Sequence, residues 1–398
     1  MRTPVAITTA LLAFAGAAPS LALDSALAQV FPEVSLPPPT GPHAIGRRTL
    51  VIVDSSRVER VQPDSGGPRV LRVRLWYPAA ETAGPNDRYM DPPTAATWVE
   101  RHDFPPGFEE RVGIHAREDA PLAASDSAWP LVLFSHGMSW PAAMYQTFLE
   151  EMASHGYVVA AIDHTGYSDA IVFPDGRLVG FTAWTEQPTT DAERRARLAA
   201  HMPTWVDDLE TALDEIERRT RNGEPFFESI AVDRVGAFGH SYGGGAAVRL
   251  MQVDPRVVAA ANLDGGAYGP DSLPFRVSEP LLHVVGGYNE AELVATEFEP
   301  DDAPLYEVLV QGAFHSTFSD LIYLHAFKAD PDWHARHRYD LDPARALRIT
   351  SDFLRAFFDR YVIRIDGERE DLLHLRSSAD LLGASTRGYP EVVVRIDF

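Results

Sequence analysis

The stretch "RVGAFGHSYGGGAAVRL", residues 234–250, constrains the fold more than any other part of the chain. An apolar run leads to Gly239, and a helix-like pattern of small residues begins directly after Gly243. The residues from one glycine to the other match G-x-S-x-G, a turn between a strand and a helix that exposes a serine nucleophile. Glycines flank the serine because side chains there would strike the neighbouring strand and helix. The stretch therefore predicts a strand, a strained turn and a helix, with Ser241 as the candidate nucleophile.

A phosphate-binding loop is the main alternative for a glycine-rich turn between a strand and a helix. This stretch contains neither G-x-G-x-x-G nor Gly-Lys followed by serine or threonine, so a nucleotide site is not expected. The formal net charge of −22 also disfavours binding to phosphate backbones and to anionic membranes. We therefore expect no nucleic acid as a partner, and the charge is compatible with neutral or cationic small substrates.

Apolar segments that alternate with helical patterns fill most of the chain from residue 130 onward. This alternation predicts an α/β domain with a mostly parallel central sheet and helices on both faces. Two earlier segments, 49–54 and 69–78, are typical of an antiparallel pair of strands. Thr204 and Asp207 resemble a capping box, so a helix is expected to begin there. Further strands are expected at residues 130–137, 157–164, 257–265, 280–287 and 305–312.

Residues 1–28 have the pattern of a secretory signal peptide, with one positive residue, an apolar stretch and small residues before a cleavage site. The alternative is a membrane anchor, but Pro19 and Asp24 shorten the apolar run below the roughly 20 residues that span a bilayer. We expect a periplasmic or secreted protein without a stable membrane anchor. The chain contains no cysteine, so disulfides and thiol chemistry are excluded.

The rest of the chain divides into three predicted regions. Residues 29–48 are proline-rich and are expected to form an extended leader rather than a packed element. One α/β domain is expected over residues 49–363, and residues 364–398 are expected to form a C-terminal extension packed on it. Residues 165–203 make a connection much longer than usual between a strand and a helix. This connection is either a lid over a pocket or a surface insertion packed by its own aromatic residues.

A serine nucleophile needs a base and an orienting acid, which in this kind of fold follow the serine in the order acid, then histidine. Asp264 ends the strand after Ser241, and His315 follows a later strand. The carboxyl ends of strands in an open α/β sheet point into one crevice, where these side chains would meet. Singly, Asp264 could be a turn residue and His315 a loop residue. Both coincidences together, in the required order, are improbable.

Acyl transfer also requires N–H donors for the oxyanion that develops on the substrate. The backbone N–H of Tyr242, directly after the nucleophile, is one candidate. The loop "FSHGMSW" (134–140) provides the other, because Gly137 allows a tight turn that can direct the N–H of Met138 at the substrate. We expect His136 to stabilise this loop rather than to take part in catalysis.

The segments "PLVLFSHGMSW", "DRVGAFGHSYGGG", "NLDGG" and "FHSTFSD" resemble the platelet-activating factor acetylhydrolase family (plasma, or type II, class) of α/β-hydrolases. The resemblance extends discontinuously over residues 70–320. The chain departs from the family in the long connection, in the two glycines after the acid and in the C-terminal tail. The resemblance implies the α/β-hydrolase fold, with Ser241 as nucleophile, Asp264 as acid, His315 as base, and Met138 and Tyr242 as oxyanion donors.

These expectations combine in one predicted function. We expect a secreted serine carboxylic-ester hydrolase that forms an acyl-enzyme with short or modest acyl esters. A lipase, a polyester hydrolase or a thioesterase could use the same residues, and a non-catalytic binding protein on the same scaffold is the alternative from another class. No cofactor and no metal are expected, since the pair His334 and His337 lacks a carboxylate at ligand spacing. The residues expected to bind the substrate are Trp140, Trp184 and Phe314.

Overall fold

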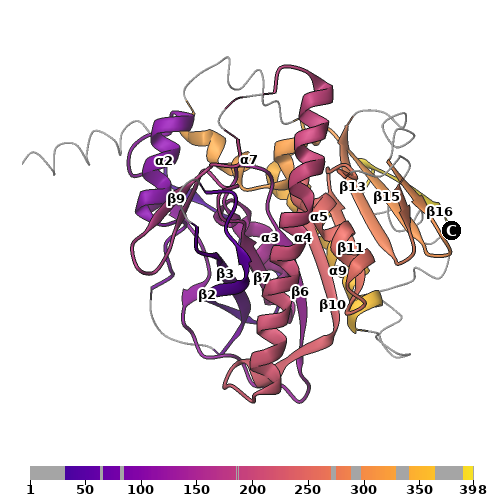
Figure 1. Ribbon diagram of the computed structural model, residues 1–398, viewed down its shortest axis with the longest axis horizontal. Helices are drawn as coiled ribbons and strands as arrows, with labels where there is room; N and C mark the ends of the chain where they lie inside the picture. The colour runs from indigo at the N-terminus through magenta and orange to yellow at the C-terminus, as the bar shows by residue number, and fades with distance from the viewer. Residues whose placement is uncertain are drawn as a thin grey trace, which may run out of the picture.

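A ten-stranded sheet forms the centre of the described part of the computed structural model (Figure 1). The structure describes residues 32–62, 66–80, 85–184, 186, 188–269, 275–287, 297–328, 340–363 and 389–397. The strands of the sheet are β2 (Ala44–Val58), β3 (Pro68–Ala79), β5 (Arg117–Glu118), β6 (Trp129–Ser135), β7 (Val158–Asp163), β10 (Ile230–His240), β11 (Val257–Leu263), β13 (Leu281–Gly287), β15 (Leu305–Gln311) and β16 (Val392–Asp397). Their order across the sheet is β16-β15-β13-β11-β10-β6-β7-β3-β2-β5.

The middle of this sheet is parallel and is flanked on each side by antiparallel pairs, while the outermost strand β5 pairs in parallel with β2. Strands β15, β13, β11, β10, β6 and β7 pair in parallel. On one side β3 pairs antiparallel with β7, and β2 pairs antiparallel with β3, so the predicted N-terminal strand pair is confirmed. On the other side β16 pairs antiparallel with β15. The C-terminal segment "EVVVRI" therefore contributes an edge strand, whereas residues 364–388 lie outside the described residues.

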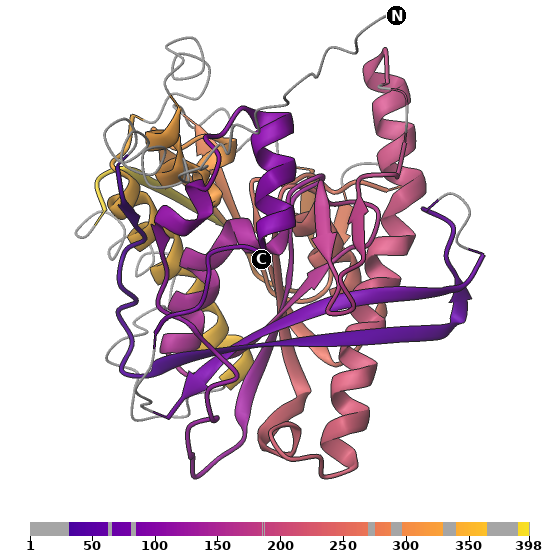
Figure 2. The same cartoon turned by 90° about the vertical axis from the view of Figure 1, so that its left-hand side faces the viewer.

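Helices cover both faces of the sheet, as predicted (Figures 1 and 2). Side chains of successive strand residues point to opposite faces. In β6, Leu131 and Leu133 pack with α4 (Asp191–Arg221) and α5 (Tyr242–Val253), whereas Val132 and Phe134 pack with α3 (Gln146–Ser154) and α9 (Pro343–Phe358). This strand is apolar on both faces because both of its faces are buried, as is typical of parallel sheets.

Helix α4 begins earlier than the sequence predicted. Its N-cap is Thr190, whose hydroxyl accepts a hydrogen bond from the backbone N–H of Glu193 at 3.2 Å. The expected start at Thr204 is wrong, because the helix continues through Pro203 without ending. The buried stripe of α4 starts only at Met202, so the first turns carry no apolar periodicity that a sequence pattern could reveal.

The proline-rich leader is extended, but it is packed against the domain. Leu36 is only 1% exposed. The short strand β1 (Val34–Ser35) pairs with β4 (Val112–Gly113). The backbone N–H of Thr40 donates to the carboxylate of Glu151 in α3 at 2.8 Å. The leader therefore has anchoring contacts that its proline content did not indicate.

Shorter elements complete the described fold. The long connection after β7 contains a small antiparallel hairpin and the first turns of α4. The remaining strands are β8 (Ala170–Val172), β9 (Leu178–Gly180), β12 (Phe275–Val277) and β14 (Phe298–Pro300). The remaining helices and helical turns are α2 (Pro92–His102), η1 (Phe108–Arg111), η2 (Ala142–Tyr145), η3 (Phe227–Ser229), η4 (His315–Phe318), α7 (Leu321–Leu324), η5 (His325–Phe327) and η6 (Asp359–Ile363).

Candidate active site

Ser241 occupies the tight turn between β10 and α5, and its backbone lies in the left-handed region at φ 55°. A β-carbon on Gly239 would lie 2.4 Å from the carbonyl carbon of Gly243, and one on Gly243 would lie 2.2 Å from the carbonyl oxygen of Ser135. Separations this short are sterically forbidden, so both positions require glycine. The turn is held directly against the end of β6. A tight turn of this kind between a strand and a helix exposes the serine of a G-x-S-x-G motif.

The structure brings the predicted acid and base into contact. Nδ1 of His315 lies 2.5 Å from Oδ2 of Asp264. The backbone N–H of Ser241 donates to the carbonyl of Leu263 at 2.8 Å, which ties the serine turn to the residue before Asp264. The His315 side chain is 54% exposed, and that of Asp264 only 18%. The imidazole is thus reachable from solvent while its carboxylate partner is largely enclosed.

Two backbone contacts fix Asp264, and one of them helps to keep its carboxylate ionised. Its Oδ1 accepts from the N–H of Gly286 at 2.9 Å, and its own N–H donates to the carbonyl of Val284 at 2.7 Å. Burial alone would raise the pKa of Asp264, but the hydrogen bond and charge of His315, with the Gly286 N–H, hold that pKa below its ordinary value. An ionised carboxylate at Nδ1 leaves Nε2 of His315 available to accept a proton.

A chain of hydrogen bonds joins the predicted oxyanion loop to the backbone of His315. The N–H of Gly137 donates to the Tyr145 hydroxyl at 2.9 Å, and this hydroxyl lies 2.9 Å from Nδ1 of His240. Nε2 of His240 lies 2.8 Å from the carbonyl oxygen of His315. Because a carbonyl oxygen can only accept, His240 carries its proton on Nε2 and accepts at Nδ1 from Tyr145. Burial, assisted by the charge of His315, lowers the pKa of His240 to about 3, so the ring is neutral.

The loop after β6 leaves the backbone N–H of Met138 available. Among the described residues, the N–H of Met138 has no internal acceptor. Tyr242 is the first residue of α5, where helical N–H groups lack an intrahelical partner. The backbone N–H groups of Met138 and Tyr242 are the two donors that the sequence predicted for the oxyanion. Three other N–H groups of the loop have internal acceptors: Gly137 has the Tyr145 hydroxyl, Ser139 the Tyr167 carbonyl and Trp140 the Gly137 carbonyl.

His136 and His164 support this loop from behind. Nδ1 of His136 lies 2.8 Å from the carbonyl of Gly137, and its Nε2 accepts from the backbone N–H of His164 at 3.1 Å. Burial lowers the pKa of His136 to about 3, and the His164 charge acts in the same direction. Nε2 of His164 lies 2.9 Å from the Ser135 hydroxyl. The predicted supporting role of His136 agrees with these contacts.

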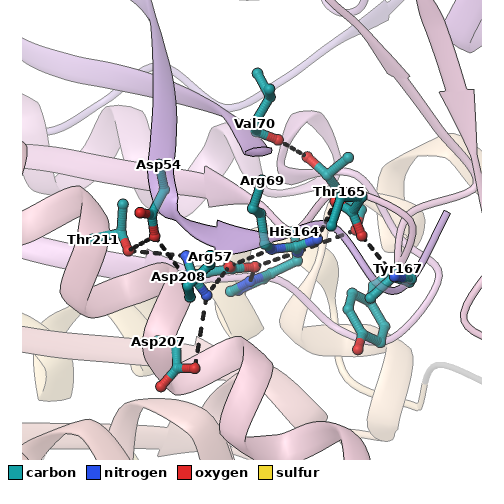
Figure 3. A network of polar contacts seen from close by, with 12 residues as sticks. Asp54, Arg57, Arg69, Val70, His164, Thr165, Tyr167, Asp207, Asp208 and Thr211 are labelled. Atoms are coloured by element: carbon teal, nitrogen blue, oxygen red, sulfur yellow. Dashed lines mark hydrogen bonds and ion pairs between the residues drawn. The ribbon is translucent and has the colours of Figure 1, made fainter. Parts of the chain in front are cut away.

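The support continues into a buried ionic network (Figure 3). Nδ1 of His164 lies 3.0 Å from the carboxylate of Asp208, which also accepts two hydrogen bonds from Arg69, both at 2.6 Å. Arg57 approaches the same carboxylate at 3.0 Å. Although burial favours the neutral form of Asp208, Arg69 and His164 outweigh it and hold the pKa of Asp208 well below its ordinary value. The predicted oxyanion loop is thereby connected to α4 and β3 through a largely buried charge cluster.

A cavity of about 320 Å³ opens beside Ser241. Met138 and Tyr242 line it, and so does Trp184, one of the residues predicted to contact substrate. Trp140 and Phe314 are not among its lining residues. Trp140 packs instead with its ring centroid 5.6 Å from that of His240. The remaining lining residues are Pro188, Arg194, Arg197, Leu198 and Tyr268.

Two family models match the sequence. The model described as "Platelet-activating factor acetylhydrolase, isoform II" matches residues 28–174. The model described as "Serine aminopeptidase, S33" matches residues 127–341, more than half of the chain. The chain belongs to this second family. The match also confirms the predicted α/β-hydrolase fold.

Relatives confirm the resemblance to platelet-activating factor acetylhydrolases. The enzyme of that name from Cavia porcellus is 22% identical over 63% of the chain, which spans 64% of the relative's length. The enzyme of the same name from Canis lupus familiaris is 22% identical over 76% of each chain. A solved ferulic acid esterase from Streptomyces cinnamoneus is 27% identical, with a TM-score of 0.71 over 91% of this chain and 99% of its own. All three carry the names of ester hydrolases.

The described part of this α/β-hydrolase shows neither a group of side chains suited to a metal ion nor a helix that could cross a membrane. His334 and His337, which were not expected to bind a metal, lie outside the described residues.

Sequence reasoning missed several residues around Ser241. Tyr145 and Asp208 were not singled out, because each meets the site only through contacts distant in the sequence. Tyr268 was also missed, although it follows Asp264 closely; burial raises its pKa, and hydrogen bonds to Gly266 and the Ser241 side chain oppose this. His240 lies inside the G-x-S-x-G motif and could have been singled out for that reason. The motif was interpreted only for its serine and its glycines.

Proposed function

We propose that the protein is a secreted carboxylic-ester hydrolase that acts through Ser241, His315 and Asp264. The observation that carries the proposal is the 2.5 Å contact between His315 and Asp264, at the strand ends next to the Ser241 turn. The names of the relatives and of the solved structure support ester hydrolysis over the peptide hydrolysis in the name of the S33 model.

In the proposed mechanism, Nε2 of His315 accepts the proton of the Ser241 hydroxyl as its oxygen attacks the ester carbonyl carbon. Asp264 accepts a hydrogen bond from Nδ1–H and stabilises the imidazolium. The N–H groups of Met138 and Tyr242 donate to the oxyanion of the tetrahedral intermediate. The C–O bond to the alcohol then breaks, and His315 returns the proton to the leaving oxygen. Water hydrolyses the remaining acyl-enzyme by the same steps.

The proposed substrates are esters with short or modest acyl groups. A cavity of about 320 Å³ lies at the small end of ordinary ligand sites, which supports a small substrate. We propose that residues 165–203 form a wall of this cavity, because Trp184, Pro188 and Leu198 belong to this segment. We also retain export through a signal peptide at residues 1–28 as part of the proposal; these residues lie outside the described structure.

Covalent labelling with a fluorophosphonate tests the proposal, because such reagents react with an activated serine. The wild type should be labelled, Ser241→Ala should not, and Ser139→Ala should be labelled like the wild type. Ser139 is a suitable control because it lies in the neighbouring loop, where its hydroxyl donates to the carbonyl of Met138 at 2.6 Å. Label retained by Ser241→Ala, or absent from the folded wild type, would exclude the mechanism.

A further inference from the structure

Two arginines from the first turns of α4 line the cavity that contains Ser241. Arg194 and Arg197 are three residues apart, so they lie on the same side of the helix. Figure 2 shows this end of α4 rising beyond the strand ends. The hydroxyl of Tyr242 donates to the carbonyl of Leu198, which fixes this part of the helix against the residue after the nucleophile. The two guanidinium groups thus belong to a positioned wall of the cavity.

The charge of this wall is opposite in sign to that of the chain. The formal net charge of the protein is −22, yet the residues that line the cavity include two arginines and no acidic side chain. Glu193 lies nearby, but its carboxylate accepts from the backbone N–H and hydroxyl of Thr189. Glu297, near Tyr268, accepts from the backbone N–H of Ala267 at 2.7 Å. Neither acidic residue lines the cavity.

The cavity arginines also differ from those at the other end of the same helix. Arg218, Arg219 and Arg221 each form an ion pair with a glutamate on the preceding turn of α4. Across the described ranges, Arg194 forms no ion pair with an acidic residue. Nη1 of Arg197 donates to the backbone carbonyl of Glu186. A carbonyl is neutral, so this hydrogen bond does not compensate the charge of Arg197. Glu193 and Arg197 lie close enough for their charges to interact. Arg194 has no such acidic partner in the described part of the chain, so its charge is available to an external anion.

We propose that this cavity selects esters that carry an anionic oxygen group, such as a carboxylate or a phosphate, on the part of the molecule that contacts Arg194 and Arg197. The guanidinium fork matches two oxygens of such a group, and hydrogen bonds between charged partners are stronger than neutral ones. Trp184 and Tyr268 would cover the uncharged part. This inference rests on the proposed ester hydrolysis and names its substrate class.

The test compares pairs of esters that are similar in size and shape and differ in charge. For a carboxylate on the leaving side, 4-acetoxybenzoate is compared with 4-acetoxybenzamide, and for one on the acyl side, mono-4-nitrophenyl adipate with 4-nitrophenyl hexanoate. 4-Acetoxyphenyl phosphate replaces the benzoate to separate phosphate from carboxylate. The measured quantity is the charge preference, defined as kcat/KM for the anionic ester divided by kcat/KM for its neutral match.

In at least one pair, the wild type should prefer the anionic ester, and Arg194→Gln/Arg197→Gln should lower that preference about tenfold or more, a loss within the range for a charge-assisted hydrogen bond. Arg195→Gln is the matched control, because Arg195 is an exposed neighbour that carries the same charge but does not line the cavity. It should keep the wild-type preference. Raising NaCl to 0.5 M should lower the preference of the wild type alone, a readout that needs no variant.

Three results would overturn the inference. One is a charge preference in the folded double variant equal to that of the wild type. Another is an equal loss in Arg195→Gln, which would indicate a general charge effect. The third is a wild-type preference that is absent or insensitive to salt. In all three cases turnover of the neutral esters would leave the proposed function intact, whereas absence of any turnover together with absence of fluorophosphonate labelling would overturn both.

Discussion

His240 donates its Nε2 proton to the backbone carbonyl of His315 at a distance of 2.8 Å. The residue directly before the candidate nucleophile therefore holds the loop that carries the candidate base. The same ring accepts from Tyr145, which in turn accepts from the N–H of Gly137. Three separate parts of the proposed machinery, namely the serine turn, the histidine loop and the oxyanion loop, are positioned through one neutral imidazole.

Replacing Tyr145 with phenylalanine should disturb this arrangement. The change leaves the N–H of Gly137 and Nδ1 of His240 without partners, at a cost of about 1–3 kcal/mol for a buried group. We expect kcat on a neutral ester to fall roughly tenfold to a hundredfold, because a loss of this size corresponds to that range of rate. Tyr157→Phe is the control. Tyr157 directly precedes β7, at the end of that strand away from the Ser241 turn, and its hydroxyl donates to the carboxylate of Asp359. Equal losses of kcat in the two variants would show that the Tyr145 contacts do not position the site.

Asp264→Asn should abolish most turnover while preserving the fold. The neutral amide cannot stabilise the imidazolium as the carboxylate does, and the equivalent change in serine hydrolases costs about 10⁴ in kcat. Steady-state kinetics and circular dichroism measure the two effects separately. A folded variant with wild-type kcat would mean that another carboxylate orients His315.

Gly243→Ala should prevent correct folding of the serine turn. Its β-carbon would lie 2.2 Å from the carbonyl oxygen of Ser135, and backbone atoms cannot move aside as a flexible side chain can. We expect a loss of more than about 3 kcal/mol in unfolding free energy, as for severe overpacking. In Gly113→Ala the nearest atom would be 3.6 Å away, so the change should cost less than about 1 kcal/mol. Urea unfolding compares the pair, and similar midpoints would contradict the steric argument.

Asp208→Asn should destabilise the protein far more than the same change at its neighbour. It removes the charge that faces Arg69, Arg57 and His164 inside the protein, and breaking a buried pair in this way costs about 3–5 kcal/mol. Asp207 has a half-exposed side chain that contacts Arg57 only at 3.8 Å, so Asp207→Asn should cost less than about 1 kcal/mol. Thermal unfolding of both variants checks the difference. An equal shift in Tm would mean that the network contributes little.

Acid should weaken the protein through carboxylates held ionised in the fold. Burial opposes ionisation of Asp54, but hydrogen bonds from Ser56 and Arg57 lower its pKa to about 2. A carboxyl whose pKa is lowered by folding stabilises the native state above its unfolded pKa near 4. That contribution is lost as the pH falls from about 4 toward 2. Asp54→Asn should therefore show a shallower fall in Tm over this range than the wild type, and parallel curves would exclude the contribution.

The part of the site that could be predicted from the sequence is the part encoded locally. The Ser241 turn depends on glycines two residues away, and Asp264 and His315 follow from the order of strands and the position of strand ends. Tyr145 and Asp208 act through contacts between distant segments, which no local pattern records, and the motif that contains His240 does not indicate its contacts with Tyr145 and the His315 loop. The misplaced start of α4 has a related cause: its first turns face solvent or the cavity, so they carry no apolar stripe, and the Thr190 cap alone did not stand out.

The two parts of α4 have different roles: the part from Met202 onward contributes to folding stability, and the turns before it are proposed to contribute to substrate selection. From Met202 onward the helix supplies side chains to the core, and changes there carry a cost in folding. The turns before it contribute Arg194, Arg197 and Leu198 to the cavity and bury little of their own surface. One continuous helix thus offers a rigid wall whose facing residues can be exchanged almost independently of the domain it belongs to. The substrate preference of the proposed enzyme could therefore evolve, or be engineered, within three turns of a single helix.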